Sequence, residues 1–424
     1  MGGLDLSRRP TTAATYSVKF INGAPTHVDV TGAVHLGDAN LAVVVPTGTV
    51  IAPADRFTII SNDGTDPVTG TFAGLPENAV VQTVGNFRLR ITYRGGDGND
   101  VVVTKIATPL TAVGAGAGGL PIVNVYDRDG GLMRSFLAYD PSFRGGVRVA
   151  VADVTGDGIW DVITAPGPGG GPHIKVFDGV TGALVRQWMA YDPAFRGGVF
   201  VAAAPIDLND DLAEIVTGAG AGGGPHVQVF DGKTGAVVTS FMAYDPAFTG
   251  GVNVAAIRKY TFVDVDPRLP SSTHPGRIVT GTGPGGGPHV RIFDGTNGRL
   301  EVEFFAYDLN FRGGVTVAAS FDTSNHGYLV TAPGPGAPPE VRVYDGSSTA
   351  FPAKSFLAYG ADFRGGVTLR VIEADRPAIL TGAGPGGGPH VRQWRFPSNN
   401  VTDFTLERDF FAFDPRFTGG IFVG

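Results

Sequence analysis

The sequence predicts an all-β protein whose larger part is a ring of repeated four-stranded units. A block of about fifty residues recurs six times, two landmarks keep a fixed phase in every copy, and no helical periodicity competes with the strand-like segments. The first landmark reads Gly-Gly-Gly-Pro-His-Val-x-Val-Phe-Asp-Gly, and its proline falls at Pro121, Pro172, Pro225, Pro288, Pro339 and Pro389. The second landmark, Ala-Tyr-Asp-Pro-x-Phe-Arg-Gly-Gly-Val, starts at Ala138, Ala190, Ala243, Ala306, Ala358 and Ala412. Repeats of this length and content indicate the blades of a six-bladed β-propeller.

Residues 1–106 precede the first copy and differ from it. Alternating or fully apolar stretches separated by glycine and asparagine turns predict a small all-β module. The expected strands are Tyr16–Ile21, Val28–Val34, Leu41–Val45, Arg56–Ile60, Val80–Val84, Phe87–Tyr93 and Val101–Thr104.

Residues 107–424 hold the propeller, and each copy contains four strand-like segments, A to D, of which A follows the Gly-Gly pair. In the copy around Pro225 these segments are Gly198–Ala204, Glu214–Thr217, Pro225–Phe230 and Val237–Tyr244. The up-and-down order places A–B loops and C–D turns on one face, and B–C and D–A loops on the other.

The phase of the copies at the two ends predicts how the ring closes. The first copy begins at its strand B, near Leu110–Gly114, and the chain ends in a strand A at Gly419–Gly424. We therefore expect the C-terminal strand to join the first blade, which would remove an exposed sheet edge.

Composition narrows the possible partners. The formal net charge of −7 argues against nucleic acid or an anionic membrane as the main partner. The chain has no cysteine, which excludes disulfides, thiolate zinc sites and a cysteine nucleophile. No stretch reaches the roughly 18 apolar residues that span a bilayer. The N-terminal residues lack the apolar run of a signal peptide, and we expect the chain to be part of a larger parent protein.

The sharpest motif lies in an A–B loop, where Asp153-Val-Thr-Gly-Asp-Gly-Ile-Trp-Asp161 places oxygen side chains at alternating positions before a glycine turn. Calcium prefers six to eight hard oxygen ligands, and this spacing is the first part of an EF-hand-like loop. The expected ligands are the side chains of Asp153, Thr155, Asp157 and Asp161 and the carbonyl of Ile159. The alternative is an Asx-rich turn without metal. The other A–B loops lack this set; Asp207-Leu-Asn-Asp-Asp211 keeps its acids at a different spacing.

Two further sets of polar residues recur on the face of the B–C and D–A loops. One set, at the phase after the proline, is His173, His226, His289, His390 and, in the fifth copy, Glu340. The other set is Arg144, Arg196, Arg312 and Arg364. A circle of histidines, one from each of several copies, could hold a ligand or metal. A circle of arginines could hold a carboxylate or sulfate on a glycan. The alternative, which repetition in nearly every copy favours, is that both sets stabilise the scaffold.

The motif Asp-x-Thr-Gly-Asp-Gly-x-x-Asp followed by Val-Ile-Thr-Ala-Pro-Gly resembles the FG-GAP/VCBS repeats of integrin-α-like propellers, although only the copy at Asp153–Asp161 keeps all the acids. The resemblance implies a calcium-stabilised extracellular propeller used for adhesion or ligand binding. The segment that contains Phe57-Thr-Ile-Ile-Ser-Asn-Asp-Gly-Thr and Tyr93-Arg-Gly-Gly-Asp-Gly-Asn-Asp-Val is similar to the C-terminal end of autotransporter-associated passenger repeats in bacterial surface proteins.

These observations predict a non-enzymatic binding or adhesion module, secreted or on the cell surface, that recognises glycan or protein. No serine-hydrolase, zinc-protease or phosphate-loop motif is present. The alternative is a glycoside hydrolase or lyase on a propeller scaffold, for which the altered fifth copy around Glu340 and Gly360 is the first place to look.

Overall fold

The structure is a computed structural model, and its regular elements are all β-strands. It describes residues 4–6, 14–21, 24–46, 56–63, 66–77, 79–84, 87–107, 111–127, 130–156, 160–179, 181–262, 272–321, 327–345, 352, 354–373, 377–396 and 403–424. The predicted all-β class is confirmed over these residues. They contain no helix that is long and apolar enough to cross a membrane.

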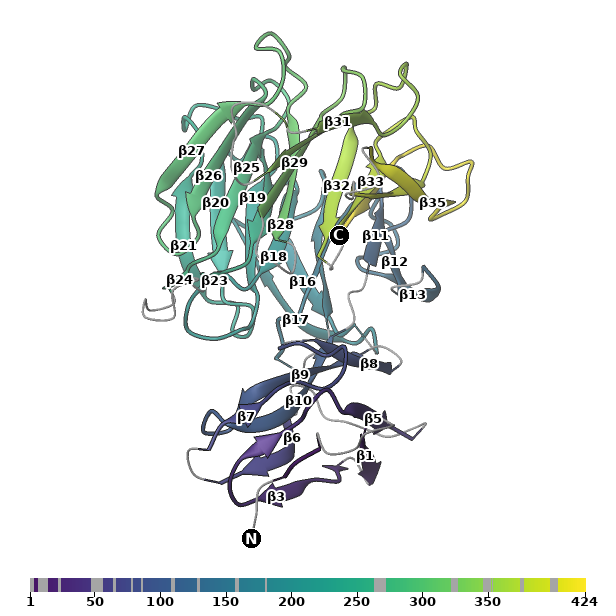
Figure 1. Ribbon diagram of the computed structural model, residues 1–424. Coiled ribbons are helices and arrows are strands. Elements are labelled where there is room, and N and C mark those ends of the chain that lie inside the picture. Colours follow the sequence, from purple (N-terminus) through teal and green to yellow (C-terminus); the bar gives the residue numbers. More distant parts are fainter. Residues whose placement is uncertain are drawn as a thin grey trace. The chain divides into compact units, whose positions relative to one another are not determined.

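The chain divides into two compact units. The first comprises residues 1–108 and 155–160, and the second comprises residues 109–154 and 161–424. Figure 1 shows the strands of both units.

The first unit contains ten strands among its described residues, and each of the seven predicted stretches overlaps at least one of them. They are β1 (Thr15–Ile21), β2 (Ala24–Pro25), β3 (Val28–Val30), β4 (Val34–His35), β5 (Asn40–Val44), β6 (Arg56–Asn62), β7 (Val68–Thr69), β8 (Val80–Val84), β9 (Phe87–Gly95) and β10 (Asp100–Ala107).

Three pairs of strands in this unit are parallel, so the unit is not a simple series of hairpins. Strand β1 pairs in parallel with β5, β3 with β6, and β4 with β7. The core between the strands contains Phe20, Ile59, Phe72, Leu89 and Ile91, all at most 1% exposed. Parallel neighbours are buried on both faces more often than antiparallel ones, which accounts for apolar runs such as Ile59-Ile60.

The second unit consists of four-stranded antiparallel sheets, each with the up-and-down strand order of a propeller blade. The described residues form six of them. The first three are β13 (Leu132–Leu137), β12 (Ile122–Tyr126), β11 (Thr111–Ala115) and β36 (Ile421–Val423); β14 (Val147–Ala152), β15 (Asp161–Pro166), β16 (His173–Phe177) and β17 (Leu184–Met189); and β18 (Val199–Ala204), β19 (Glu214–Ala219), β20 (His226–Phe230) and β21 (Val237–Met242). The other three are β22 (Val252–Ile257), β25 (Arg277–Thr282), β26 (His289–Asp294) and β27 (Leu300–Phe305); β28 (Val315–Phe321), β29 (Gly327–Pro333), β30 (Glu340–Asp345) and β31 (Lys354–Leu357); and β32 (Val367–Ile372), β33 (Ala378–Ala383), β34 (His390–Arg395) and β35 (Thr405–Phe411). A separate hairpin, β23 (Tyr260–Phe262) with β24 (Ser272–His274), leaves the A–B loop between β22 and β25.

Strand D is the most exposed strand of each sheet. Every residue of β14 and β15 is buried, whereas β17 alternates between exposed and half-buried positions. The inner strands contact one another in the order β14, β18, β22, β28, β32 and β36, and β36 also contacts β14. This packing explains why B strands such as β15, β19 and β33 are buried without alternation.

The Gly-Gly pair before each strand A is required by backbone geometry. The second glycine has a positive φ, as in Gly146 (86°) and Gly251 (86°). A Cβ on the first glycine, at Gly145, would lie 2.0 Å from the carbonyl oxygen of Pro168 in the neighbouring B–C loop. Both glycines therefore let the D–A turn pass close to the next sheet.

Candidate functional site

The D–A and B–C loops form the face on which the recurring polar residues lie, and the tyrosine of Ala-Tyr-Asp-Pro organises it. The hydroxyl of Tyr244 donates to the backbone carbonyl of His289 in the following sheet (3.0 Å) and lies 3.0 Å from Oγ1 of Thr280. The same contacts recur at Tyr139, Tyr191 and Tyr307, and Tyr359 bonds to the carbonyls of Thr381 and His390. Burial raises the pKa of these phenols, so they remain protonated donors.

A second contact links the same neighbours. The third residue of each strand C donates to the backbone carbonyl of the alanine that precedes the tyrosine in the preceding copy; for example, Arg291 donates to Ala243 (2.9 Å). The other pairs are Lys175 with Ala138, Gln228 with Ala190, Arg342 with Ala306, Arg392 with Ala358, and Asn124 with Ala412. The donors range from asparagine to arginine, so the position requires a hydrogen-bond donor and not a charge.

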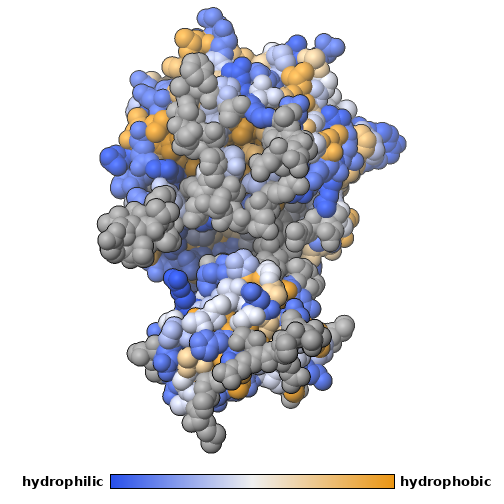
Figure 2. Space-filling view, viewed as in Figure 1, coloured by the Kyte–Doolittle hydropathy of each residue, from blue (hydrophilic) through white to orange (hydrophobic). Residues whose placement is uncertain are grey.

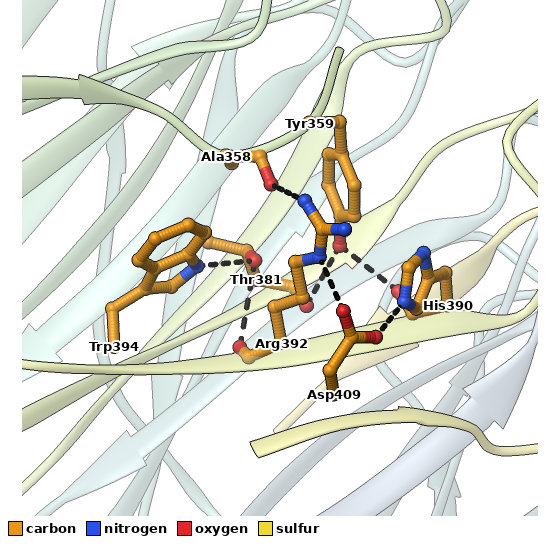
Figure 3. Close-up of polar contacts among 7 residues, drawn as sticks. All are labelled: Ala358, Tyr359, Thr381, His390, Arg392, Trp394 and Asp409. Carbon is orange, nitrogen blue, oxygen red and sulfur yellow. Dashed lines mark hydrogen bonds and ion pairs between the residues drawn. The ribbon is translucent and has the colours of Figure 1, made fainter. Parts of the chain in front are cut away.

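The four recurring histidines and Glu340 each occupy the first position of a strand C. The backbone carbonyls of these same residues accept from the tyrosine hydroxyls. Each histidine has a side-chain neighbour on strand D of its own sheet: His226 with Ser240 (2.8 Å), His289 with Glu303 (3.2 Å) and His390 with Asp409. In Figure 3, Asp409 joins His390 to Arg392, which also bonds to Ala358.

Two further members of the set complete this pattern. His173 lies beside Gln187, and Glu340 pairs with Arg342 (2.9 Å). Each of these five side chains therefore bonds within its own sheet, and the five do not converge on one point. In the fifth copy, the carboxylate of Glu340 therefore pairs with a guanidinium two residues along its own strand.

Partial burial of the histidines predicts acid sensitivity. Burial lowers the pKa of His173, His226 and His289 below the ordinary value. A depressed histidine pKa means that the unfolded chain binds more protons, so stability is complete above the unfolded pKa of about 6.5 and is lost as the pH falls through and below it. We expect the melting temperature to fall between about pH 7 and about pH 5, and the fall to be smaller in His226→Gln. Melting curves of both proteins at the two pH values check this.

A histidine on the surface supplies the control for that experiment. The side chain of His27 is 57% exposed, and His27→Gln is the matched control variant. An equal pH dependence in His226→Gln and the wild type would contradict the assignment.

The four recurring arginines form hydrogen bonds within their own D–A turns. Nη1 of Arg144, Arg196, Arg312 and Arg364 donates to the backbone carbonyl of the preceding phenylalanine at 3.0 or 3.1 Å, and to that of the residue three positions earlier. The aspartates of the same turns accept from the backbone N–H two residues later, as Asp192 does from Ala194 (2.8 Å). These four arginines therefore bond to backbone carbonyls of their own turns.

The acid loop predicted to bind calcium is described in part. Asp157 and Ile159 lie outside the described residues. Asp161 opens β15 with 0% exposure, and one of its carboxylate oxygens accepts from the backbone N–H of Val154 (3.1 Å). Asp153 and Thr155 lie on the described part of the same loop.

A second acidic cluster lies in the next A–B loop, which the spacing of its acids did not reveal. Carboxylate oxygens of Asp207, Asp210 and Glu214 all lie within 4.8 Å of one another. Glu214 occupies the place of Asp161: it opens its strand, is 4% exposed, and accepts from the backbone N–H of Ile206 (2.5 Å). Burial raises the pKa of Glu214. The signal in the sequence is the acid at the start of strand B.

Comparisons with known proteins give structural likenesses only. No family model matches the sequence, and no curated protein matches it. Among solved structures, the Dos1 propeller has a TM-score of 0.40 at 14% identity, covering 74% of this chain and 72% of that chain. Hsv2 of Kluyvelomyces marxianus has a TM-score of 0.36 at 9% identity, covering 78% and 93%. A protein of unknown function from Bacteroides caccae has a TM-score of 0.40 at 11% identity, covering 74% and 99%.

Proposed function

We propose that the second unit is a closed six-bladed propeller that acts as a non-enzymatic binding module, stabilised by calcium, secreted or on the cell surface. Contacts between copies support the closed ring. An aromatic residue of each strand D packs on one of strand C in the next copy, as Phe241 does on Phe293 with ring centroids 4.7 Å apart. The other pairs are Phe136–Phe177, Trp188–Phe230, Phe304–Tyr344, Phe356–Trp394 and Phe410–Tyr126. The last pair joins the sixth copy to the first.

A paired change in the sequence supports the same closure. In the sixth copy the second landmark has Phe413 in place of tyrosine, and strand B of the first copy has Val113 where the other copies have threonine. Both residues belong to one apolar cluster, with Val113 0% exposed. In other copies the tyrosine hydroxyl contacts the threonine hydroxyl of the next copy. Loss of both hydroxyls together, one from the sixth copy and one from the first, fits a junction between these two copies.

The observation that carries the binding function is the apolar outer rim. Most of the exposed large apolar side chains among the described residues lie on the outer D strands: Leu132, Met133, Leu137, Leu184, Val185, Met189, Val237, Val238, Met242, Leu300, Val302, Phe305, Leu357, Leu406 and Phe411. Figure 2 shows such groups between polar residues on the viewed face. Apolar side chains repeated on exposed edge strands favour contact with a protein over a glycan.

Binding assays test this function. We expect the protein to bind a protein partner on a surface-protein array, and Met189→Lys together with Val238→Lys to weaken that binding by at least about tenfold. The matched control is Lys233→Met, on the C–D turn of the same region. Binding to a glycan array alone, unaffected by the two lysines, would contradict the assignment to the outer rim.

Calcium is proposed at the Asp153–Asp161 loop, because its donors are hard oxygens and a buried carboxylate closes the loop at β15. The similar cluster around Glu214 is a second candidate. The resemblance to FG-GAP/VCBS repeats and to surface-protein passenger ends supports the proposed location.

A calcium titration tests the proposed metal site. Excess calcium over EDTA should stabilise the fold by about 3 kcal/mol when its concentration is about 100 times Kd, and Asp161→Asn should lose most of this gain. Differential scanning calorimetry with and without calcium measures it. Asp192→Asn removes an equal charge from a D–A turn and should respond as the wild type; an unchanged response in Asp161→Asn would sink the site.

A further inference from the structure

The inner strands of all six sheets line one cavity of about 280 Å³. Its wall is formed mainly by glycine, proline and valine, with the aromatic rings of Phe200 and Phe422. The residue after Gly-Gly-Val or Gly-Gly-Ile in each copy contributes a side chain: Arg148, Phe200, Asn253, Thr316, Thr368 and Phe422. None of the residues that line the cavity is acidic.

Arg148 is the one charged residue among those that line this cavity, and it is 8% exposed. Its Nη1 donates to the backbone carbonyl of Val199 (3.1 Å), whereas its Nε has no hydrogen-bond partner. The guanidinium carbon lies 3.7 Å from the centre of the Phe200 ring and 5.5 Å from that of Phe422. No carboxylate pairs with it among the residues that the structure describes.

The hydrogen bond from Arg148 to the next inner strand does not need a charge. Asn253 donates to the carbonyl of Val315 (2.9 Å), and Thr368 donates to the carbonyl of Ile421 (3.1 Å). Each acceptor is the first residue of the next inner strand, as Val199 is for Arg148. Neutral side chains therefore join neighbouring inner strands at two other places, so this hydrogen bond does not by itself account for the charge of Arg148.

A buried guanidinium without a carboxylate is costly. Removal of a cation from water is offset only when its donors are satisfied and an opposite charge lies nearby. Burial lowers the pKa of Arg148 to about 9, which still leaves it charged near neutral pH. One carbonyl and an aromatic face offset part of the cost, and Nε is left buried without a hydrogen-bond partner.

We propose that this cavity binds a small organic carboxylate, whose oxygens bond to the guanidinium of Arg148 and whose apolar body packs against Phe200 and Phe422. Arginine recognises carboxylates through paired, parallel hydrogen bonds. A dry cavity of about 150 Å³ holds benzene, so this cavity has room for a ring with a short chain. The site is independent of calcium and of the outer rim.

Calorimetric titration of the full chain with benzoate and 3-phenylpropionate tests the proposal, with benzamide and 3-phenylpropionamide as neutral counterparts. We expect the carboxylates to bind at least about tenfold more tightly than the amides. Arg148→Met should remove this preference, and Arg148→Gln, which keeps a donor for Val199, should do the same. Arg299→Met changes an arginine that is 73% exposed and should bind as the wild type.

Melting curves without ligand show whether the variants fold. Loss of a surplus buried charge should leave the melting temperature of Arg148→Met equal to or above that of the wild type. Equal affinity for carboxylate and amide, undiminished carboxylate binding by both Arg148 variants, or no binding of either carboxylate at about 20 mM would overturn the proposal. Binding of inorganic sulfate or phosphate alone would overturn the organic ligand.

Discussion

Removal of residues 421–424 is expected to lower the melting temperature by about 10 °C or more, because it opens the proposed ring. The truncation removes the buried side chains of Ile421 and Val423, each worth about 1.5–3 kcal/mol. It also removes the carbonyl acceptors of Thr368 and Arg370 and leaves β11 as an exposed edge. For a unit of this size each kcal/mol corresponds to about 2–4 °C, and differential scanning calorimetry measures the shift.

A disulfide supplies the converse experiment. Val113 and Val423 are partners in the β11–β36 ladder, and the hydrogen-bonded pairs flank them, since Ala112 and Gly424 exchange both backbone bonds. Cα atoms at such non-hydrogen-bonded positions are about 4.5 Å apart, within the range of a disulfide. Val113→Cys with Val423→Cys should oxidise quantitatively in this cysteine-free chain and raise the melting temperature. The single-cysteine variants are the controls, and a truncated protein that melts with the wild type would rule out closure by β36.

Tyr244→Ala is expected to destabilise the propeller by about 3–5 kcal/mol, the usual cost of deleting a buried aromatic side chain. Tyr244 is 7% exposed and joins two copies through the carbonyl of His289 and the hydroxyl of Thr280, with the Arg291 guanidinium 5.2 Å from its ring centre. Tyr244→Phe removes only the hydroxyl and should cost about 1–3 kcal/mol, because buried acceptors lose their donor. Urea unfolding curves give both values.

The junction of the last and first copies suggests the matched control. There the phenylalanine and valine at positions 413 and 113 stand where the other copies have tyrosine and threonine. Tyr244→Phe with Thr280→Val should therefore recover part of the stability that Tyr244→Phe loses. Full additivity of the two single changes would show that the hydroxyls do not form one contact.

Much of the architecture was predictable because every copy repeats the same local chemistry. The strand positions follow from apolar stretches between glycine turns, and the positive φ of Gly146 and its equivalents explains the Gly-Gly pair. The role of Glu214 was not predictable from loop spacing. Its backbone partner Ile206 is eight residues earlier, whereas Val154 is seven residues before Asp161, so one extra residue shifts the acids out of the expected pattern.

The roles of the polar residues were likewise predictable only in part. Sequence repetition favoured a scaffold role for the histidines, but it could not identify their partners on strand D, since these differ from copy to copy as serine, glutamate and aspartate. The tyrosine hydroxyls, which the sequence analysis did not single out, link neighbouring copies because the carbonyls they bind belong to the next sheet.

The sequence by itself determined the repeated unit, its four strands and its turns, because these depend on neighbours within a few residues. The tertiary structure decided what the variable residue of each inner strand does. Arg148, Phe200 and Phe422 belong to different copies, and only the arrangement of the inner strands around one cavity places a guanidinium between two aromatic rings. Burial and charge balance depend on those distant neighbours, and no local pattern in the sequence specifies them.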